Sequence, residues 1–323
     1  MTDVLIYSPF AHQTGQGNTV TADRTELILR SAGFSVISEG GSYSGRDAKC
    51  LIALNARRSA AEVAGFDELN PGRQIIVVVT GSDINHPQME DECSDTRKTM
   101  VRADALVMLH ETDLEALPAE LRKKAECIFP SVKLPGGIKH RPWDGDRFEV
   151  IMAGNLRAVK NPQLAVEGAL LLTDDSPVFI SSYGDAPAEL AAEMTLASEQ
   201  AGHFQWCGKV DHDSLMEKMA RAHLLLNTST LEGGANAICE AVSMGLPVVA
   251  SDIRGNIGML GSDYPGLFAS GDAKAMVGLL QRCAETASFH ADLKRAVEQR
   301  AVLFDFARES EAWVGLLRSR LAH

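Results

Sequence analysis

Several features that define membrane, secreted and zinc-binding proteins are missing from this sequence of 323 residues. No stretch reaches the ~18 consecutive apolar residues that a membrane-spanning helix requires. The segment MTDVLIYSPF has no basic residues before its short apolar run, so it predicts a first strand and not a signal peptide. The six cysteines form no CxxC pair, and most lie in apolar runs, where a thiol behaves as a small hydrophobic group. We therefore expect a reduced, cytoplasmic protein with no structural zinc and no membrane partner.

Positive charge is also in short supply. The chain has 31 Lys and Arg residues against 43 Asp and Glu residues, and its formal net charge is −12. This balance argues against the broad basic surface that binds nucleic acid non-specifically. An anionic ligand would have to be held by a local cluster of cations and N–H groups.

The chain is long and apolar enough to fold as about two ordinary domains. Hydrophobic residues make up 45% of it and charged residues 23%, which is typical of a soluble globular protein. Short apolar runs alternate with helical patterns along the whole sequence, and this alternation predicts parallel sheets covered by helices on both faces. The predicted strands are Val4–Ser8, Phe34–Ser38, Leu51–Asn55, Ile75–Thr80, Ala105–Leu109, Cys127–Ser131, Phe148–Ala153, Val178–Ser182, Phe204–Cys207, Leu224–Thr228, Val248–Ser251 and Leu267–Ser270.

Twelve strands are too many for one ordinary doubly wound sheet, so the chain should divide. Pro, Gly and charged residues cluster at 134–146, where the periodicity stops. We predict Rossmann-like domains at 1–133 and 147–304, with 134–146 as the linker. In such folds ligands bind at the carboxyl ends of the strands, so two facing sheets would enclose a cleft between the domains. Residues 305–323 predict a final helix that can pack on either domain, with an apolar stripe formed by Phe306, Trp313, Leu316, Leu317 and Leu321.

The most informative segment is LLLNTSTLEGGANAICEAVSMGLPVVASD, residues 224–252. It predicts a strand, a loop with Gly233 and Gly234, a helix from about Ala235 to Met244, and another strand. Two glycines before a helix allow close approach of a ligand and direct free N–H groups at an anion, so this segment predicts a diphosphate site. The alternative is a simple turn followed by a solvated Glu240.

Other polar groups follow predicted strands. Arg157 and Lys160 lie in the loop after the first strand of the second domain. In the first domain, Arg57 and Arg58 begin a helix and predict an anion site for a phosphate-bearing acceptor, unless they are solvated or pair with acids such as Glu62. A further loop carries Ser82 and Asp83, which we assign to the same acceptor site.

The segment 224–252 resembles the donor site of GT-B glycosyltransferases, in particular glycosyltransferase family 4. Glu232 and Glu240 have the family's spacing of two glutamates, and the following GLPVVAS matches its next strand. The resemblance implies that Glu240 binds the ribose, that Glu232 contacts the donor sugar, and that N–H groups from Gly233 to Asn236, including Gly234 and Ala235, hold the phosphates.

Two further stretches resemble this family. GNLRAVKN matches the loop whose Arg and Lys clamp the diphosphate: Lys160 is in place, whereas Asn155 stands at the Arg position and Arg157 can supply the missing charge. The loop with Gly15, Gly17 and Asn18 resembles the first GT-B loop, which approaches the donor phosphates. It fails the GxGxxG pattern because Val20 replaces the third glycine, which disfavours a dehydrogenase.

Over nearly its whole length the sequence also resembles the selenosugar synthases of selenoneine biosynthesis, a branch related to family 4. Stretches that carry this resemblance include LIALNARRSAAEVAGF, NPGRQIIVVVTGSDI and ASDIRGNIGMLGSDYPGLF. The resemblance implies a GT-B fold and transfer of a hexose from UDP-N-acetylglucosamine or UDP-glucose to selenophosphate. Lys160, Glu232 and Arg157 are then the candidate catalytic residues.

The expected chemistry needs no general base, because an ionised selenophosphate is already a nucleophile. We expect no metal or other cofactor, since cations and N–H groups can stabilise the leaving diphosphate. Asp211-His212-Asp213 is the only tempting metal motif, and its place before an apolar helix predicts an N-cap. The sequence is compatible with a homodimer. The alternatives are a family 4 enzyme acting on a hydroxyl or thiophosphate acceptor, and a UDP-sugar-binding protein without catalysis.

Overall fold

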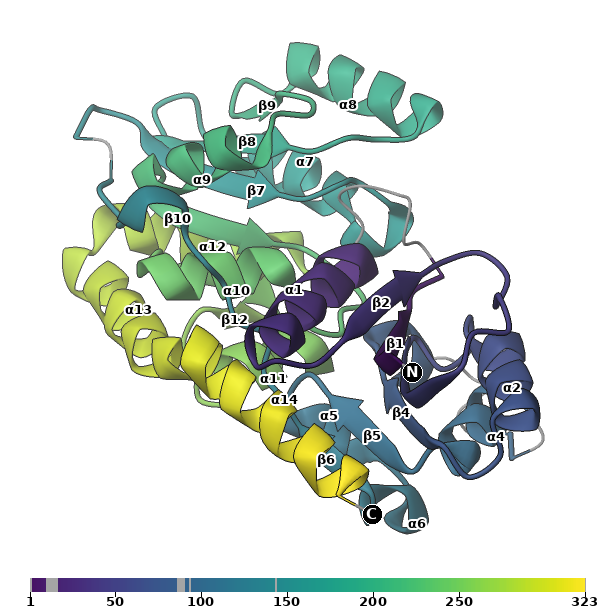
Figure 1. Ribbon diagram of the computed structural model, residues 1–323. Coiled ribbons are helices and arrows are strands. Elements are labelled where there is room, and N and C mark those ends of the chain that lie inside the picture. Colours follow the sequence, from purple (N-terminus) through teal and green to yellow (C-terminus); the bar gives the residue numbers. More distant parts are fainter. Residues whose placement is uncertain (1, 10–16, 86–90, 93, 143, 323) are drawn as a thin grey trace. The chain divides into compact units, whose positions relative to one another are not determined.

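Twelve strands form two parallel sheets in the computed structural model, which describes residues 2–9, 17–85, 91–92, 94–142 and 144–322 (Figure 1). The strand order is β2-β1-β3-β4-β5-β6 in the first sheet and β12-β11-β10-β7-β8-β9 in the second. Both orders place later strands beside earlier ones through helical crossovers, as a doubly wound fold requires. The strands are β1 (Thr2–Tyr7), β2 (Val36–Glu39), β3 (Ala48–Leu54), β4 (Gln74–Val78), β5 (Ala105–Met108), β6 (Ala125–Cys127), β7 (Phe148–Ala153), β8 (Val178–Tyr183), β9 (Phe204–Trp206), β10 (Leu224–Asn227), β11 (Val248–Ser251) and β12 (Leu267–Phe268).

Each predicted strand has a counterpart, and the predicted fold class is confirmed. The largest error is at β6, which ends at Cys127 instead of extending to Ser131. Ile128 and Phe129 are buried, so the apolar run continues in the sequence after the ladder has ended.

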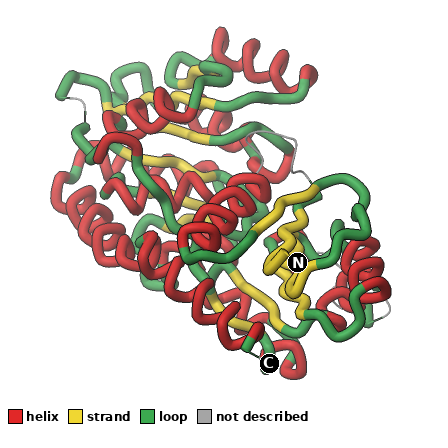
Figure 2. Tube along the Cα trace, in the orientation of Figure 1, coloured by secondary structure: helices red, strands yellow, loops and turns green. Residues whose placement is uncertain are grey.

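The chain divides into two compact units, and Figure 2 shows helices alternating with strands in both. Unit 1 comprises Met1–Pro130 and Phe306–His323, and unit 2 comprises Ser131–Asp305. The helices of unit 1 are α1 (Gly17–Ser31), α2 (Ala60–Leu69), α3 (Gly81–Ile84), α4 (Asp95–Arg102), α5 (Glu111–Ala116), α6 (Ala119–Arg122) and α14 (Phe306–Leu321). Those of unit 2 are η2 (Pro135–Gly137), η3 (Ala158–Lys160), α7 (Pro162–Leu171), α8 (Ala188–Gln200), α9 (His212–Arg221), α10 (Asn236–Met244), α11 (Arg254–Leu260), α12 (Ala273–Glu285), α13 (Ala287–Arg300) and η4 (Ala301–Phe304).

Both faces of the first sheet are covered. Successive strand residues point to opposite faces, so Leu5 and Ile6 belong to separate hydrophobic clusters. The cluster with Ile6 also contains Trp313 and Leu317 from α14, which lies beside α1 (Figure 1). The C-terminal helix therefore completes the core of unit 1, in agreement with the expected apolar stripe.

An ion pair also fixes α14 to α1. Arg24 donates from Nε to both carboxylate oxygens of Glu309, at 3.0 and 2.9 Å. The two side chains are 12% and 2% exposed. Because a buried charge is costly without its partner, this pair ties the end of the chain to its first helix.

The segment between the two sheets packs on unit 2. The backbone N–H groups of His140 and Arg141 donate to the carbonyls of Met244 and Ala220, at 3.1 and 2.7 Å. The His140 ring lies 2.9 Å from the carbonyl oxygen of Ala222. Among the described helices, none has both the length and the apolar character needed to cross a membrane.

Candidate functional site

The candidate residues of unit 2 gather at the carboxyl edge of its sheet. Strands β10 and β7 are parallel neighbours, so the loops that follow them leave the same edge side by side. The loop after β7 leads to Lys160, and the loop after β10 leads to Glu232 and then to α10.

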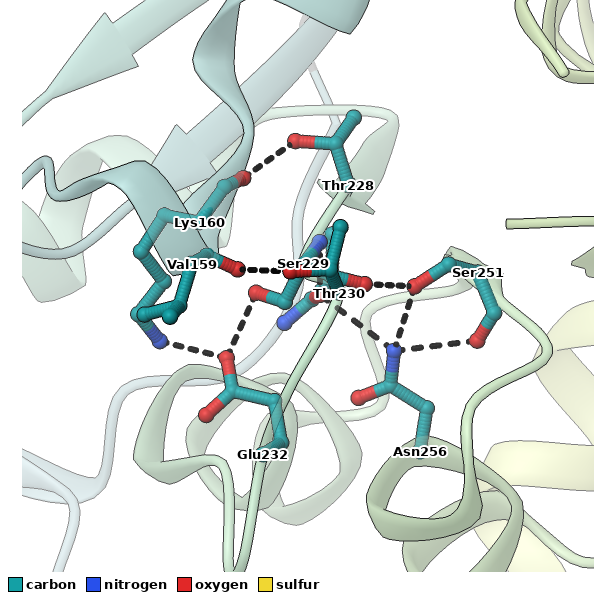
Figure 3. A network of polar contacts seen from close by, with 9 residues as sticks. Val159, Lys160, Thr228, Ser229, Thr230, Glu232, Ser251 and Asn256 are labelled. Carbon is teal, nitrogen blue, oxygen red and sulfur yellow. Dashed lines mark hydrogen bonds and ion pairs between the residues drawn. The ribbon is translucent and has the colours of Figure 1, made fainter. Parts of the chain in front are cut away.

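Lys160 and Glu232 form an ion pair at the centre of this edge (Figure 3). Lys160 Nζ donates to Glu232 Oε1 at 2.5 Å, and Ser229 Oγ donates to the same oxygen at 2.6 Å. The side chains of Lys160 and Glu232 are 22% and 10% exposed. A mostly buried pair of this kind is held in one geometry and is poorly screened by solvent.

Backbone contacts fix the two loops to each other. Thr228 Oγ1 donates to the carbonyl of Lys160 at 2.8 Å, and the N–H of Thr230 donates to the carbonyl of Val159 at 2.8 Å. Figure 3 shows Thr228 and Thr230 next to Lys160 and Val159, close to the ion pair. The position of Lys160 is therefore set by the backbone as well as by Glu232.

A buried polar network is connected to the ion pair through Ser229. Asn256 is fully buried and donates from Nδ2 to the carbonyl and the hydroxyl of Ser251, at 3.0 and 3.1 Å. Ser251 Oγ donates to the carbonyl of Ser229 at 2.5 Å, which connects the network to the hydroxyl that binds Glu232 (Figure 3). Gly255 packs closely against the backbone of Glu232: a Cβ atom at this position would lie 2.5 Å from the carbonyl oxygen of Glu232.

The charge of Glu232 follows from these contacts. Burial alone would raise the pKa of its carboxyl group. The Lys160 ammonium and the hydrogen bonds from Lys160, Ser229 and Asn227 outweigh burial and hold that pKa below its usual value. Glu232 is therefore ionised at neutral pH and can bind hydroxyl groups as an acceptor.

Helix α10 begins at Asn236, one residue later than predicted, and Ala235 is its N-cap. Ala235 has no side chain that could cap the helix, and the N–H of Ile238 donates to the carbonyl of Ala235 at 2.9 Å. The N–H groups before Ile238 and the positive end of the helix dipole are available to an anion. Gly245 ends the helix in the left-handed conformation, as the sequence predicts.

Glu240 lies in the second turn of α10, and only 14% of its side chain is exposed. The His212 ring at the start of α9 reaches it: Nε2 lies 3.0 Å from Glu240 Oε1. The alternative of a solvated Glu240 is therefore wrong. Asp211 is the N-cap of α9, as predicted, because its side chain accepts from the N–H of Ser214.

The two other candidates in the loop after β7 differ in role. Asn155 Oδ1 accepts from the N–H of Asp185 at 3.1 Å, so its amide fastens this loop to the one after β8. Arg157 precedes η3, and its exposed side chain has no partner among the described residues. Of the two, only Arg157 offers an available charge.

The acceptor candidates of unit 1 lie on two adjacent loops. Asp83 is fully buried, and its carboxylate accepts from the N–H groups of Ala56, Arg57 and Thr80, at 3.1, 3.0 and 2.9 Å. Burial raises the pKa of Asp83, against the opposing effect of these bonds. Asp83 thus positions the loop that carries Arg57 and Arg58, here called the arginine loop. Its own carboxylate is turned away from solvent.

The same loops are joined by Asn55, whose backbone is left-handed with φ of 69°. Its amide donates to the hydroxyls of Thr80 and Ser82, at 2.8 and 2.7 Å. Arg57 is partly buried, and its Nε atom has no hydrogen-bond partner in the described chain, whereas Arg58 is exposed. The loop therefore presents at least one cation that is not neutralised by the predicted competitor Glu62.

Of the first-loop candidates, Gly15 lies outside the described residues. Gly17 and Asn18 were expected in a loop, but they form the first turn of α1. The hydroxyl of Thr21 donates to the carbonyl of Gly17 at 3.1 Å, which helps to extend the helix back to this point.

Several residues of these networks were not predicted from the sequence, among them His212 as the partner of Glu240, and Ser229 and Asn256 in the network around Glu232. His212 was visible only as part of a capping motif, and the other two had no signal apart from their place after strands. Within the described ranges, no group of three or more His, Cys, Asp and Glu side chains could hold a metal ion.

Comparison with known proteins agrees with this architecture. Residues 147–286 match a protein family described as glycosyl transferases group 1. Sucrose-phosphate synthase from Thermosynechococcus elongatus is 14% identical, with a TM-score of 0.79 and full coverage of both chains. HepE from Anabaena, solved with UDP and glucose, is 14% identical, with a TM-score of 0.76 over 99% of this chain and 100% of its own.

A third structure is similar over part of its length. The pneumococcal O-GlcNAc transferase GtfA, in complex with UDP and GlcNAc, is 14% identical, with a TM-score of 0.65 over 94% of this chain and 60% of its own. At these identities the likeness concerns the fold, and it confirms the expected GT-B fold.

Proposed function

Because residues 147–286 match a family described as glycosyl transferases group 1, we propose that the protein transfers a hexose from a UDP-sugar to selenophosphate. The selenium atom forms a bond to C1 of the hexose while the bond from C1 to the diphosphate oxygen breaks, and UDP leaves with the electron pair. Water then hydrolyses the phosphorus–selenium bond, which releases phosphate and a 1-selenosugar.

The observation that carries the donor assignment is the Lys160–Glu232 pair beside the uncapped start of α10. An ammonium group has three N–H donors, and Glu232 occupies one of them. The others can bind the diphosphate, whose charge grows as the bond to C1 breaks. Arg157 adds a second cation from the same loop, and the N–H groups from Gly233 to Asn236 complete the set.

The two glutamates then divide the donor between them. Glu240 accepts from the ribose hydroxyls and Glu232 from hydroxyls of the hexose. Structures of HepE with UDP-glucose and of GtfA with UDP and GlcNAc support a UDP-linked hexose as the donor class. UDP-glucose and UDP-N-acetylglucosamine are accordingly the first donors to test.

The acceptor assignment rests on the arginine loop of unit 1 and on the sequence resemblance to selenosugar synthases. Arg57 and Arg58 can bind the phosphate oxyanions, and guanidinium groups suit this geometry. Asp83 and Ser82 hold the loop from the neighbouring strand end. An ionised selenium nucleophile needs no general base, and none is assigned.

The experiment is to incubate the protein with UDP-glucose or UDP-N-acetylglucosamine and selenophosphate, and to follow UDP and a selenosugar by mass spectrometry. Parallel reactions replace selenophosphate with thiophosphate or with a simple alcohol. A selenosugar supports the proposal. Transfer only to the alcohol or only to thiophosphate would show that selenophosphate is not the acceptor. UDP binding without any turnover would identify a sugar-nucleotide-binding protein.

A further inference from the structure

His212 and Glu240 are joined by a contact that the donor assignment does not use. The His212 ring at the start of α9 places Nε2 3.0 Å from Oε1 of Glu240, which is 28 positions later in the chain. The His212 side chain is 58% exposed, whereas that of Glu240 is 14% exposed. The ring therefore lies at the surface beside a carboxylate that is nearly buried.

The start of α9 is held firmly. Asp211 accepts from the N–H and the hydroxyl of Ser214, at 2.9 and 2.7 Å, which fixes the first turn of the helix. Glutamate has a long side chain with several rotatable bonds, and fixing it has an entropic cost. A ring held in place by the cap can bind one oxygen of Glu240 and leave the other oxygen for a ligand.

We propose that His212 is a positioning residue that orients Glu240 toward the ribose of the bound nucleotide. This inference rests on the proposed function, in which Glu240 accepts from the ribose hydroxyls. It adds that the preference for a ribonucleotide over a 2′-deoxyribonucleotide depends on His212, a residue that has no direct contact with the reacting atoms.

The charge of the ring supports this role. The hydrogen bond to Glu240 raises the pKa of His212 against the opposing effect of burial, and the charges of Glu240, Asp213 and Asp211 raise it further. Asp213 Oδ1 lies 4.0 Å from the second ring nitrogen. Protonated His212 donates a charge-assisted bond, which holds the carboxylate more firmly than a neutral ring does.

The test compares the dissociation constants of UDP and 2′-deoxy-UDP by calorimetry between pH 6 and pH 8.5. The ratio of interest is the dissociation constant of 2′-deoxy-UDP divided by that of UDP. Because the two ligands carry the same diphosphate and base, this ratio measures the contribution of the 2′-hydroxyl. His212→Ala should reduce this ratio about threefold to tenfold, the effect expected for one hydrogen bond. The ratio for the unaltered protein should fall as His212 loses its proton with rising pH.

Two further variants separate positioning from folding. His212→Gln retains an N–H donor near Nε2 without a titrating group, so it should keep most of the ratio and lose the pH dependence. Glu217→Gln changes an exposed carboxylate on the same helix and should leave the ratio and its pH dependence unchanged.

Other outcomes would overturn the inference. Equal weakening of both nucleotides by His212→Ala would show that the ring only stabilises α9. If neither dissociation constant changed, Glu240 would need no partner. If the unaltered protein bound neither nucleotide, the donor site itself would be misassigned and the inference would fail with it.

Discussion

Lys160 and Glu232 are 72 positions apart in the sequence, yet Nζ of the lysine lies 2.5 Å from Oε1 of the glutamate. The parallel pairing of β7 with β10 makes this possible, since it brings the loops after both strands to one edge. The pair also keeps a buried carboxylate ionised beside the positive end of α10. The two residues are thus a single electrostatic unit.

Removing the cation should impair turnover and should also lower stability, because it leaves the Glu232 carboxylate buried without its partner. Lys160→Met takes away the charge that stabilises the departing diphosphate, so we expect kcat/KM for the UDP-sugar to fall about 100-fold or more. Steady-state kinetics, with circular dichroism to check folding, would measure this. Lys209→Met removes an exposed lysine of the same unit and should leave the kinetics unchanged; an equal loss in both variants would contradict the assignment.

A methyl group at Gly255 should disturb Glu232 without touching its side-chain partners. The added Cβ would lie 2.5 Å from the carbonyl oxygen and 2.8 Å from Cβ of Glu232, so the loop or α11 must move. We expect Gly255→Ala to destabilise the protein by about 1–3 kcal/mol, the usual cost of overpacking, and to lower kcat.

The matched control for this change is Gly278→Ala. Gly278 also lies in a helix, α12, but a Cβ atom there has no neighbour within 4 Å. Alanine at that position should therefore stabilise the protein by about 0.5–1 kcal/mol and leave kcat unaltered. Denaturant unfolding of both variants gives the comparison, and a stable, active Gly255→Ala protein would refute the proposed restraint on Glu232.

Substitutions in the arginine loop of unit 1 should weaken the use of selenophosphate without weakening the binding of UDP. Replacing both Arg57 and Arg58 with Ala should raise KM for selenophosphate about tenfold or more, since charged hydrogen bonds to the oxyanion are lost. Binding of UDP, measured by calorimetry, should stay the same. Arg73→Ala, a surface change at a guanidinium 3.9 Å from Asp47, serves as the control.

Equal loss of selenophosphate use and UDP binding in the double variant would place these arginines elsewhere in the mechanism. The bonds from this loop to Asp83 come from backbone N–H groups, including that of Arg57, so both substitutions should preserve them and the variant should stay folded.

Stability should fall on the acid side because of His140. Burial lowers the pKa of this ring to about 4, with smaller contributions from Lys294, His290 and His223, while the bond to Ala222 opposes the shift. An unfolded chain, with a histidine pKa near 6.5, binds more protons than the folded one between pH 6.5 and pH 4. The free energy of unfolding should therefore decrease as the pH falls through this interval.

His140→Gln tests this origin. The amide can still donate to the carbonyl of Ala222, but it does not titrate. Melting temperatures from calorimetry should show a shallower decline between pH 6.5 and pH 4 than for the unaltered protein, with little difference at pH 8. An unchanged acid slope would exclude His140 as the titrating group.

The fold was predictable from the sequence because buried parallel strands appear as continuous apolar runs, a pattern that survives without knowledge of the partners. Phe148–Ala153 and Val248–Ser251 were predicted to the residue. The end of β6 was not, since burial continues at Ile128 where the hydrogen-bonded ladder has stopped.

The site residues were predictable where they lie close to one another in the sequence. Glycines before a helix and two glutamates at a fixed spacing lie within one short segment. Asn155 shows the limit: its residue type suggested a weakened ligand contact, but its amide binds the backbone of Asp185, which only the folding of β8 beside β7 brings near. His212 and Asn256 escaped detection for the same reason.

The return of α14 to the core of unit 1 has a consequence for how the protein is made. Trp313 and Leu317 fill the same cluster as Ile6 and Ile28, although almost the entire chain separates them. A ribosome must therefore release the whole second unit before the first can close its core. The N-terminal part is synthesised first but completed last, so one apolar face of its nascent sheet stays without its α14 cover until synthesis reaches that helix.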